Sequence, residues 1–312
     1  MRLRSEVFVV EQNCVYLDLD DKDAQSIHLF ACEEGAVAGA AARAVVRLVP
    51  PGVSYEEPSI GRVAIDLASR GSGLGEELMM RAIRACYRTW PGFGIRISAQ
   101  QYLIGFYERL GFATVGEGYL EDDIPHIQMF RPWDGLASWR TRHRAAVQVF
   151  ADHLRALPLG ALQGTESQWG GLQVLEHLMR SEHGTWSYLD KKGQANPAEL
   201  PVCDVESDAR GIQLVHALES DDRWKDPTPG GLLSPSPGGH VDVGRAVDEW
   251  LKAIDGGYER LGALYADPAW WKVQVFKHPI AGRLGLTDTL AFGVAHVRHH
   301  VHQLKRLAES AL

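Results

Sequence analysis

Two groups of residues in this sequence combine chemically useful side chains with a spacing that would bring them together. The first is a run of glycines, Gly71, Gly73 and Gly75, which follows Arg70 and leads into an amphipathic helical pattern. The unpaired N–H groups and positive dipole at a helix N-terminus attract anions, and glycines let the backbone approach them. This run therefore predicts a phosphate or pyrophosphate site. The second group is a histidine cluster at 295–304, which predicts a metal site.

The spacing within the glycine run separates it from two other phosphate-binding loops. A Walker loop needs Lys and Ser or Thr directly after its last glycine, but Glu76 and Glu77 stand there. A dinucleotide-binding loop needs three glycines in the order G-x-G-x-x-G. The order here is Arg70-x-x-Gly73-x-Gly75, which resembles the acyl-coenzyme A pyrophosphate loop of the GNAT acetyltransferases.

Further segments extend this resemblance to the ElaA-like branch of the family. They are LRSEVFVVEQNCVYLDLDDKD at 3–23, RVAIDLASRGSGLG at 62–75 and YLEDDIPHIQM at 119–129, and the resemblance covers residues 1 to about 131. Gln100 stands where the family often has Asn, as it does in the ElaA-like branch. That branch normally has a strand before the segment that begins here at Leu3. Either the chain starts too late, or the domain lacks an edge strand.

The resemblance implies an α+β domain with a mixed sheet, and acetyl-coenzyme A as the acyl donor. The strands expected at 61–67 and 95–99 should splay apart, with the pantetheine arm between them. Tyr107, in the helix expected at 102–112, should lie near the thioester sulfur and protonate the departing thiolate, unless it is an ordinary helix aromatic. The cofactor-binding residues implied in this way are Val63, Ile65, Arg70, Gly71, Ser72, Gly73, Leu74 and Gly75.

Acyl transfer to an amine also requires a group that accepts a proton from the amine. Glu11, Glu121 and His126 are the candidates, because all three are polar residues within the ElaA-like segments. Each also has a simpler explanation: Glu11 as a helix cap or solvated residue, Glu121 as part of a charged loop, and His126 as packing at a strand start. The acidic segment 18–23 would suit a cationic substrate, although a solvated turn explains it more simply.

Composition and length limit the remaining possibilities. A chain of 312 residues with 45% hydrophobic and 23% charged residues is typical of two globular domains. A net charge of −8 argues against nucleic acid as a main partner. The sequence contains no apolar run that could span a membrane, no signal peptide and no C-x-x-C pair, so we expect reduced thiols in a cytoplasmic protein. A dimer is compatible with the sequence but not predicted by it.

The second half of the chain has the periodicity of long helices. Beyond the junction at 131–135, apolar residues recur at helical spacing in four segments, 136–156, 168–190, 241–266 and 286–309. These predict an all-α antiparallel four-helix bundle over 136–312, after an acyltransferase domain at 1–132. The long connection at 191–240 is expected to hold a short helix near 207–221 and then an irregular Pro/Gly/Ser stretch.

The histidine spacing places a possible metal site in this bundle. His296 and His300 are four residues apart, so they share one helix face and can share an ion. His177 lies among apolar residues of the second helix, although a lone buried histidine is usually a hydrogen-bonded core residue. His299 and His302 point to other sides of the helix, so we expect them to be exposed or to support the ligands.

Three further features of this half resemble the DinB-like four-helix metalloproteins. They are Trp169, the segment HPIAGRLGLTD at 278–288, and the pattern H-x-x-x-H-x-x-Q ending at Gln303. Some members of that superfamily are transferases that use a low-molecular-weight thiol. Open coordination by three imidazoles suits Zn²⁺, Ni²⁺ or Fe²⁺. The metal ligands implied by the resemblance are His177, His296 and His300.

The sequence therefore leaves two alternative hypotheses for the function, which belong to different classes of enzyme. The leading hypothesis is an acetyl-coenzyme A-dependent N-acetyltransferase that acts on an unidentified small-molecule amine and is fused to a metal-binding bundle. The alternative is a thiol-dependent, metal-using detoxification transferase whose first domain is a degenerate acyl-coenzyme A-binding module. Thermal stabilisation by acetyl-coenzyme A, or destabilisation by a chelator, would separate the two.

Overall fold

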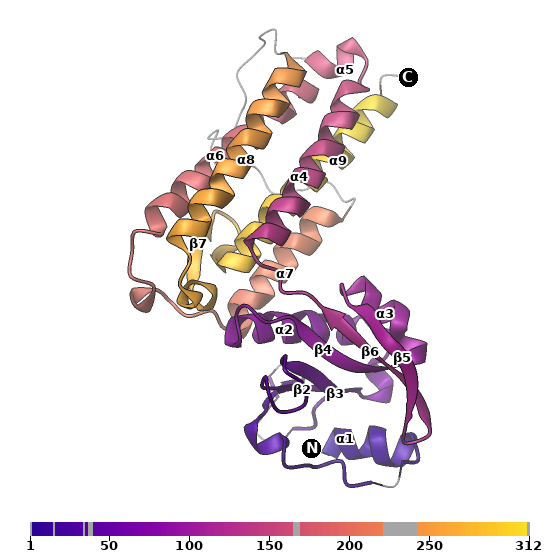
Figure 1. Cartoon of the computed structure of the whole chain (residues 1–312). Helices are drawn as coiled ribbons and strands as arrows, with labels where there is room; N and C mark the ends of the chain where they lie inside the picture. The colour runs from indigo at the N-terminus through magenta and orange to yellow at the C-terminus, as the bar shows by residue number, and fades with distance from the viewer. Residues whose placement is uncertain are drawn as a thin grey trace. The chain divides into compact units, whose positions relative to one another are not determined.

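The computed structural model describes residues 2–14, 16–33, 35–36, 40–164, 169–220 and 242–310. The chain forms two compact units, Met1–Trp133 and Asp134–Leu312, each with its own hydrophobic core (Figure 1). The irregular Pro/Gly/Ser stretch expected at 222–239 lies outside the described residues.

The first unit is built on a six-stranded mixed sheet. Its strands are β1 (Ile27–Ala31), β2 (Ala44–Val49), β3 (Ser59–Ile65), β4 (Ile95–Gln100), β5 (Ala113–Glu121) and β6 (Ile124–Arg131). Their order in the sheet is β1-β2-β3-β4-β6-β5, and of these pairs β3–β4 alone is parallel. The expected mixed-sheet α+β fold is therefore confirmed.

One long helix, α2 (Leu74–Thr89), packs on this sheet and fixes the position of the glycine run (Figure 1). Leu78, Ala82 and Cys86 recur every four residues and, with Met79, are buried in the core. Burial of a large apolar side chain such as Leu or Met contributes about 1.5–3 kcal/mol. The start of α2 is thereby held directly after the end of β3, where the glycines lie.

Short helical segments complete the first unit. They are α1 (Arg2–Arg4), η1 (Ser5–Glu11), η2 (Asp23–Gln25), η3 (Leu67–Ser69), η4 (Gln101–Leu103) and α3 (Ile104–Arg109). The helix expected within 102–112, with Gly111 as its end, corresponds to η4 followed by α3. It ends before Gly111, whose φ of +85° is the left-handed conformation that stops a helix.

Four long helices dominate the second unit. The helices of this unit are α4 (Leu136–Arg155), α5 (Leu159–Gln163), α6 (Gly171–Lys192), α7 (Val205–Glu219), α8 (Val243–Leu264) and α9 (Leu286–Glu309). Helices α4 and α6 each pack against both α8 and α9, which is the arrangement of a four-helix bundle. The described parts of the four predicted long helices agree with these bounds to within three residues, and the predicted short helix is α7.

A small hairpin in the second unit was not predicted. Between α8 and α9 lie η7 (Pro268–Lys272) and the antiparallel strands β7 (Gln274–His278) and β8 (Gly282–Gly285); η5 (Pro197–Glu199) precedes α7. Gly282 has a φ of +76°, which the tight turn between the two strands requires. The bundle has an extensive apolar core, in which Val147, Phe150, Leu178 and Ile254 have no exposed surface.

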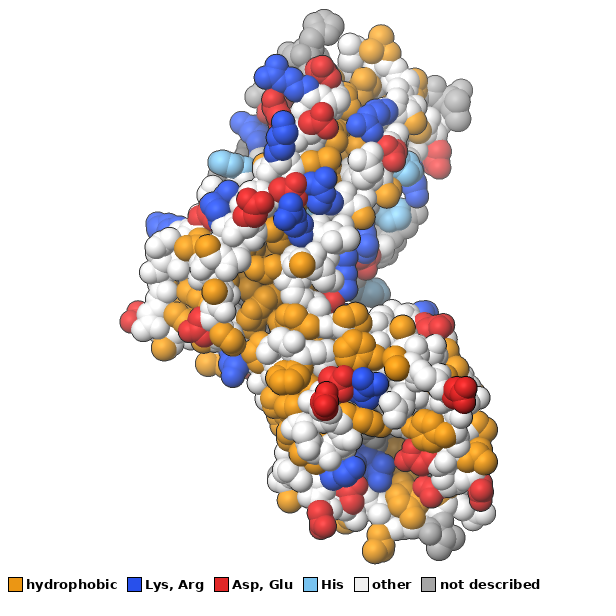
Figure 2. All heavy atoms as spheres, viewed as in Figure 1, with side chains coloured by type: hydrophobic (Ala, Val, Ile, Leu, Met, Phe, Trp, Pro, Cys, Tyr) orange, Lys and Arg blue, Asp and Glu red, His pale blue; other side chains and the backbone are white. Residues whose placement is uncertain are grey.

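The charged surface of the chain is mixed in sign. On the face drawn in Figure 2, Lys and Arg side chains are interspersed with Asp and Glu over the described residues. All four cysteines lie in described segments and are free thiols. None of the described helices is both long and apolar enough to cross a membrane.

Candidate functional site

The first site lies where β3 and β4 separate. These two parallel strands are paired at Ser59 and Arg96, and the amide of Arg96 also donates to the carbonyl of Pro58 at 3.1 Å. Beyond this point β4 pairs with β6, and β3 pairs with β2 as far as Ile65. The two strands therefore part over the segment that contains Val63, which is the arrangement expected for the pantetheine arm.

The chain from β3 to α2 is organised by its own hydrogen bonds. The carboxylate of Asp66 accepts from the amides of Ala68 and Ser69 at 3.0 and 3.1 Å, and from the Ser69 hydroxyl at 2.5 Å. The Ser72 hydroxyl donates to the carbonyl of Ser69 at 2.7 Å. These hydrogen bonds within the segment hold the shape of the loop.

Two glycines in this loop have backbone angles that other residues adopt only under strain. Gly71 has a φ of +76° and Gly73 a φ of +87°, and a Cβ at either position would meet no atom within 4 Å. Glycine is thus needed for its conformation, and the space above the loop is open. Because Gly73 is the N-cap of α2, this open turn leads directly into a helix N-terminus, which attracts anions.

One of the two acidic residues at the start of α2 is paired within its own helix. Glu77 forms an ion pair with Arg81, one turn further along the helix, at 2.6 Å. This pair compensates the charge of Glu77, and the N-terminal dipole of α2 favours acidic side chains in the first turn.

Arg70 is paired with one of the candidate bases. Its two terminal nitrogens donate to the two carboxylate oxygens of Glu11 at 2.6 and 2.7 Å, and its Nε donates to the carbonyl of Ile65 at 3.2 Å. The hydrogen bond from Arg70 lowers the pKa of Glu11. A carboxylate with a lowered pKa is a weaker base, so this geometry does not favour Glu11 as the proton acceptor.

Tyr107 lies inside the core of the first unit. It is 7% exposed and makes edge-to-face contacts with Phe106 and Phe112, with ring centroids 5.1 and 6.0 Å apart. Burial, with a smaller effect from Tyr102, raises the pKa of Tyr107 to about 12. The hydroxyl therefore keeps its proton at neutral pH, as a proton donor must.

The other two candidate bases flank a tyrosine at the ends of β5 and β6. The Ser98 hydroxyl shares a 2.6 Å hydrogen bond with Tyr119 and donates to Glu121 at 2.9 Å. The ring of His126 stacks on Tyr119, with centroids 6.2 Å apart, and its Nδ1 lies 2.8 Å from the carbonyl of Ile124. In the neutral ring this contact puts the proton on Nδ1 and the lone pair on Nε2.

Ser98 and Tyr119 were not predicted as site residues. The sequence pattern could have placed Ser98 on the face of β4 away from the core. Ile95, Ile97 and Ala99 occupy alternate positions of this strand and are buried in the core. Ser98 must therefore lie on the opposite face of β4. Tyr119 has no comparable signal, since β5 is exposed along most of its length.

The interpretation of the acidic segment 18–23 as a solvated turn is wrong for three of its carboxylates. They form ion pairs of 2.6–3.0 Å with three arginines of the same unit, and the pairs are Arg4–Asp18, Arg4–Asp23, Arg47–Asp20, Arg47–Asp23 and Arg62–Asp18. Arg4 has no exposed surface. Burial opposes ionisation of Asp23, but hydrogen bonds from Arg4 and other donors outweigh it and hold the pKa of Asp23 well below its usual range. These carboxylates serve the fold and are not open to a cationic substrate.

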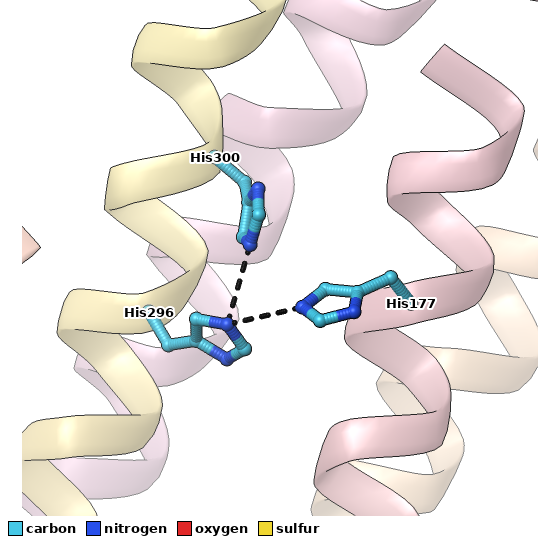
Figure 3. Close-up of side chains that lie close together, drawn as sticks. All are labelled: His177, His296 and His300. Carbon is cyan, nitrogen blue, oxygen red and sulfur yellow. Dashed lines mark hydrogen bonds between the residues drawn. The ribbon is translucent and has the colours of Figure 1, made fainter. Parts of the chain in front are cut away.

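The three predicted metal ligands meet in the second unit. Figure 3 shows the imidazole of His177, from α6, pointing at those of His296 and His300 from α9. Nε2 of His296 lies 3.3 Å from Nε2 of His177 and 3.2 Å from Nε2 of His300, and one ligand atom from each residue lies within 4.8 Å of the others. Two nitrogens bound at about 2.0–2.1 Å to one tetrahedral ion would be about 3.4 Å apart. Two of the three nitrogen pairs therefore have a spacing close to that around such an ion.

Two of the three rings, those of His296 and His300, are neutral at physiological pH. Burial, helped by the neighbouring histidines, lowers the pKa of His296 well below its usual value. Burial and His177 lower the pKa of His300 to about 3, although a hydrogen bond to Gln303 opposes the shift. Nδ1 of His300 lies 2.7 Å from Oε1 of Gln303, which accepts the Nδ1 proton and leaves the lone pair on Nε2. Neutral imidazole is the form that binds a metal.

The neighbours of this cluster differ from expectation in one respect. His299 is 8% exposed, its Nδ1 lies 3.0 Å from the carbonyl of Leu218 in α7, and its ring lies edge-on to that of His300 with centroids 5.3 Å apart, so it is a buried residue that packs beside a ligand. The expectation that it might be exposed is wrong. Trp169 lies against His177, with ring centroids 5.3 Å apart, and so forms part of the wall of the site.

Comparisons with known proteins place the first unit in a family. Residues 6–131 match the acetyltransferase (GNAT) domain family. The chain is 43% identical over 129 residues to a UPF0039 protein of Synechocystis sp., covering 41% of this chain and 81% of that protein. It is 37% identical over 133 residues to protein ElaA of Escherichia coli, covering 42% of this chain and 84% of ElaA.

Two solved structures are also similar to this chain. One is an acyl-CoA N-acyltransferase from Pseudomonas aeruginosa, with 45% identity, a TM-score of 0.39, and coverage of 42% of this chain and 85% of that one. The other is Escherichia coli ElaA, with 36% identity, a TM-score of 0.38 and the same coverages. Through its N-terminal unit, the chain belongs to the GNAT acetyltransferase family with ElaA-like relatives, and it is an acyltransferase.

Proposed function

We propose that this protein transfers an acetyl group from acetyl-coenzyme A to the nitrogen of a small-molecule amine. The pyrophosphate would bind at 70–75, against the N-terminus of α2, and the pantetheine arm would lie along Val63 and Ile65. The observation that supports this most strongly is the open loop in which Gly71 and Gly73 have positive φ beside two parting strands. Ser72, Leu74 and Gly75 complete the proposed loop.

The proposed roles of the catalytic residues follow from the chemistry. The neutral amine attacks the thioester carbonyl, the carbon–sulfur bond then breaks, and the thiolate takes a proton from Tyr107. The proton lost by the amine passes to Glu121 or His126, directly or through water. Both flank Tyr119, whereas Glu11 is engaged by Arg70. Arg70 must leave Glu11, at least in part, to contact a pyrophosphate.

Two measurements test this proposal: the binding of acetyl-coenzyme A, and then the transfer of its acetyl group to an amine. Acetyl-coenzyme A should raise the melting temperature of the purified chain, since any ligand that binds only the folded state stabilises it. Release of the free coenzyme A thiol should then depend on addition of an amine from a panel of primary amines. Absence of both effects would contradict the proposal.

The second unit supports a separate proposal. Residues 136–312 would form a DinB-like domain, after an acetyltransferase domain at 1–132, with His177, His296 and His300 binding one divalent ion. Three converging Nε2 atoms with no carboxylate among them suit Zn²⁺, Ni²⁺ or Fe²⁺. When bound, the ion would supply a Lewis acid that lowers the pKa of a bound water or thiol.

The fit of these nitrogens to an ion also supports the alternative function, a thiol-dependent transferase with a degenerate acyl-coenzyme A module. Elemental analysis of the purified chain should find one equivalent of metal. Activity towards an electrophile that requires both this metal and a low-molecular-weight thiol, without response to acetyl-coenzyme A, would favour the alternative. Light scattering would measure the molar mass in solution and so show whether the chain forms a dimer.

A further inference from the structure

The sheet of the first unit carries a polar face on β4, β6 and β5, three strands that are neighbours in the sheet (Figure 1). Ile95, Ile97 and Ala99 of β4 are buried in the same core as α2, so the side chains between them project from the opposite face. Directly opposed residues of antiparallel strands share a face, and the pairing registers extend this face across β6 and β5. Its polar side chains are Arg96, Ser98, Gln100, Tyr119, His126 and Gln128.

Two side chains of this face and a neighbouring carboxylate form a directed chain of hydrogen bonds. The carboxylate of Glu121 accepts, so the 2.9 Å hydrogen bond between Ser98 and Glu121 uses the single hydroxyl proton of Ser98. The 2.6 Å hydrogen bond between Ser98 and Tyr119 must then be donated by the Tyr119 hydroxyl. The protons are therefore ordered from Tyr119 through Ser98 to Glu121, and the Tyr119 oxygen is the end of the chain that can accept a further proton.

This hydrogen-bond chain borders the gap in which the acyl group is proposed to lie. The pairing between β3 and β4 joins Ser59 to Arg96, and Ser98 is two residues further along β4, where the strands have parted. Tyr107 belongs to the core that includes α2, on the other side of the sheet. An acyl carbon in the gap would therefore have the proposed acid on one side and the hydrogen-bond chain on the other. An amine can approach from the polar face while the leaving sulfur stays near Tyr107.

The other charged and titratable groups of this face leave the chain intact. Arg96 is engaged by Glu57, because its Nε and a terminal nitrogen donate to the two carboxylate oxygens at 3.0 and 2.8 Å. Burial raises the pKa of Tyr55, in the segment before β3, and Tyr119 and Glu121 add to the shift, so this phenol stays protonated beside them. The hydroxyl chain is therefore the route by which Glu121 is connected to this face.

His126 supports the tyrosine and lies outside the chain. Its ring stacks on that of Tyr119, with centroids 6.2 Å apart and an angle of 26° between the planes. An imidazole nitrogen accepts a proton in the plane of its ring, so a stacked ring does not present its lone pair to the ring beneath it. Nδ1 is already engaged by the carbonyl of Ile124 at 2.8 Å. His126 therefore limits the orientation of Tyr119, and the hydrogen-bonded route runs to Glu121.

We propose that the substrate amine loses its proton through Tyr119 and Ser98 to Glu121, an inference that rests on the acetyl transfer proposed above. As the amine nitrogen bonds to the acetyl carbon, its excess proton passes to the Tyr119 oxygen, the Tyr119 proton passes to Ser98, and the Ser98 proton passes to Glu121. The carbon–sulfur bond then breaks and the thiolate takes the proton of Tyr107. Exchange with water removes the proton from Glu121 and restores that of Tyr107. Tyr119 thus contacts the amine, and Ser98 and Glu121 act through it.

Single and double substitutions in the full-length chain test this route with an amine that the wild-type chain acetylates. Ser98→Ala and Glu121→Gln should each lower kcat about 100-fold, with little change in the KM for acetyl-coenzyme A. The double variant should be no slower than the slower single variant, because both substitutions interrupt the same route. Ser98→Thr keeps a hydroxyl and should keep most of the rate. Losses that multiply in the double variant, or equal losses in Ser98→Thr and Ser98→Ala, would overturn the proposal.

Two aromatic substitutions separate the hydrogen-bonded route from stacking. Tyr119→Phe keeps the stacked ring and removes the hydroxyl, and it should slow turnover as much as Ser98→Ala does. His126→Phe keeps a ring and removes both nitrogens, and it should lower kcat far less; a loss equal to that of Tyr119→Phe would overturn the route. Tyr102→Phe, at an exposed tyrosine, is the matched control. Absence of amine-dependent coenzyme A release in the wild-type chain would contradict the acetyl transfer itself, whereas an active wild type with an equally active Ser98→Ala would contradict this route alone.

Discussion

The two candidate sites of this chain are built on opposite principles. The loop at 70–75 offers backbone N–H groups at an open turn, and its shape depends on left-handed angles at Gly71 and Gly73. The histidine cluster offers side chains in the interior of a bundle, and His177 and His296 lie 119 residues apart in the chain. A backbone site can thus be specified by one contiguous segment, whereas a side-chain site requires helices to pack before it exists.

The largest effect is expected at the histidine cluster. His296→Ala should remove all stoichiometric metal, because Nε2 of His296 is the atom that lies close to both of the other rings. Elemental analysis of the purified variant is the measurement. His302→Ala, on the same helix but outside the cluster, should keep its metal. Full metal content in His296→Ala would show that the ligand set is incorrect.

At the loop, Gly73→Asp should reduce acetyl-coenzyme A affinity at least about 100-fold. The substitution places a negative charge at the N-terminus of α2 and strains a residue with a φ of +87°. Calorimetric titration measures the change. Gly92→Asp is the control, since Gly92 also has a positive φ and open space around it but lies in another turn. Equal losses in the two variants would indicate general destabilisation.

Replacement of the proposed proton donor should slow turnover without loss of binding. Tyr107→Phe keeps the buried ring and removes the hydroxyl, so kcat should fall about 100-fold with little change in acetyl-coenzyme A affinity. Because the pKa of Tyr107 is raised to about 12, the wild-type rate should show no ionisation of this group between pH 7 and about 10. Tyr102→Phe, at an exposed tyrosine, is the control. A normal rate in Tyr107→Phe would assign the residue to packing.

The smallest effect concerns stability in acid. The pKa of Asp23 is lower in the folded protein than in the unfolded chain, so the unfolded state binds more protons at acidic pH. The stabilisation is complete above the unfolded pKa of about 3.9 and is lost as the pH falls from there towards the folded pKa. Asp23→Asn should lower the melting temperature at pH 7 and reduce this acid dependence. Asp21→Asn, at an exposed neighbour, should leave both unchanged.

Local patterns predicted most of the fold. The strand expected at 95–99 corresponds to β4, and helical periodicity predicted the long helices of the second unit, because burial of one helix face imposes that repeat. The hairpin of β7 and β8 was missed. Its strands are only five and four residues long, too short for a distinct period.

The sequence by itself determined the glycine loop, because three closely spaced glycines at a helix start specify a backbone conformation locally. It also determined the spacing of His296 and His300 on one helix face. Only the tertiary structure decided that Glu11 pairs with Arg70, that the carboxylates of 18–23 are held by arginines, and that Ser98 links Tyr119 to Glu121. These partners come from segments far apart in the chain, and packing of the helices and strands is what brings them within bonding distance.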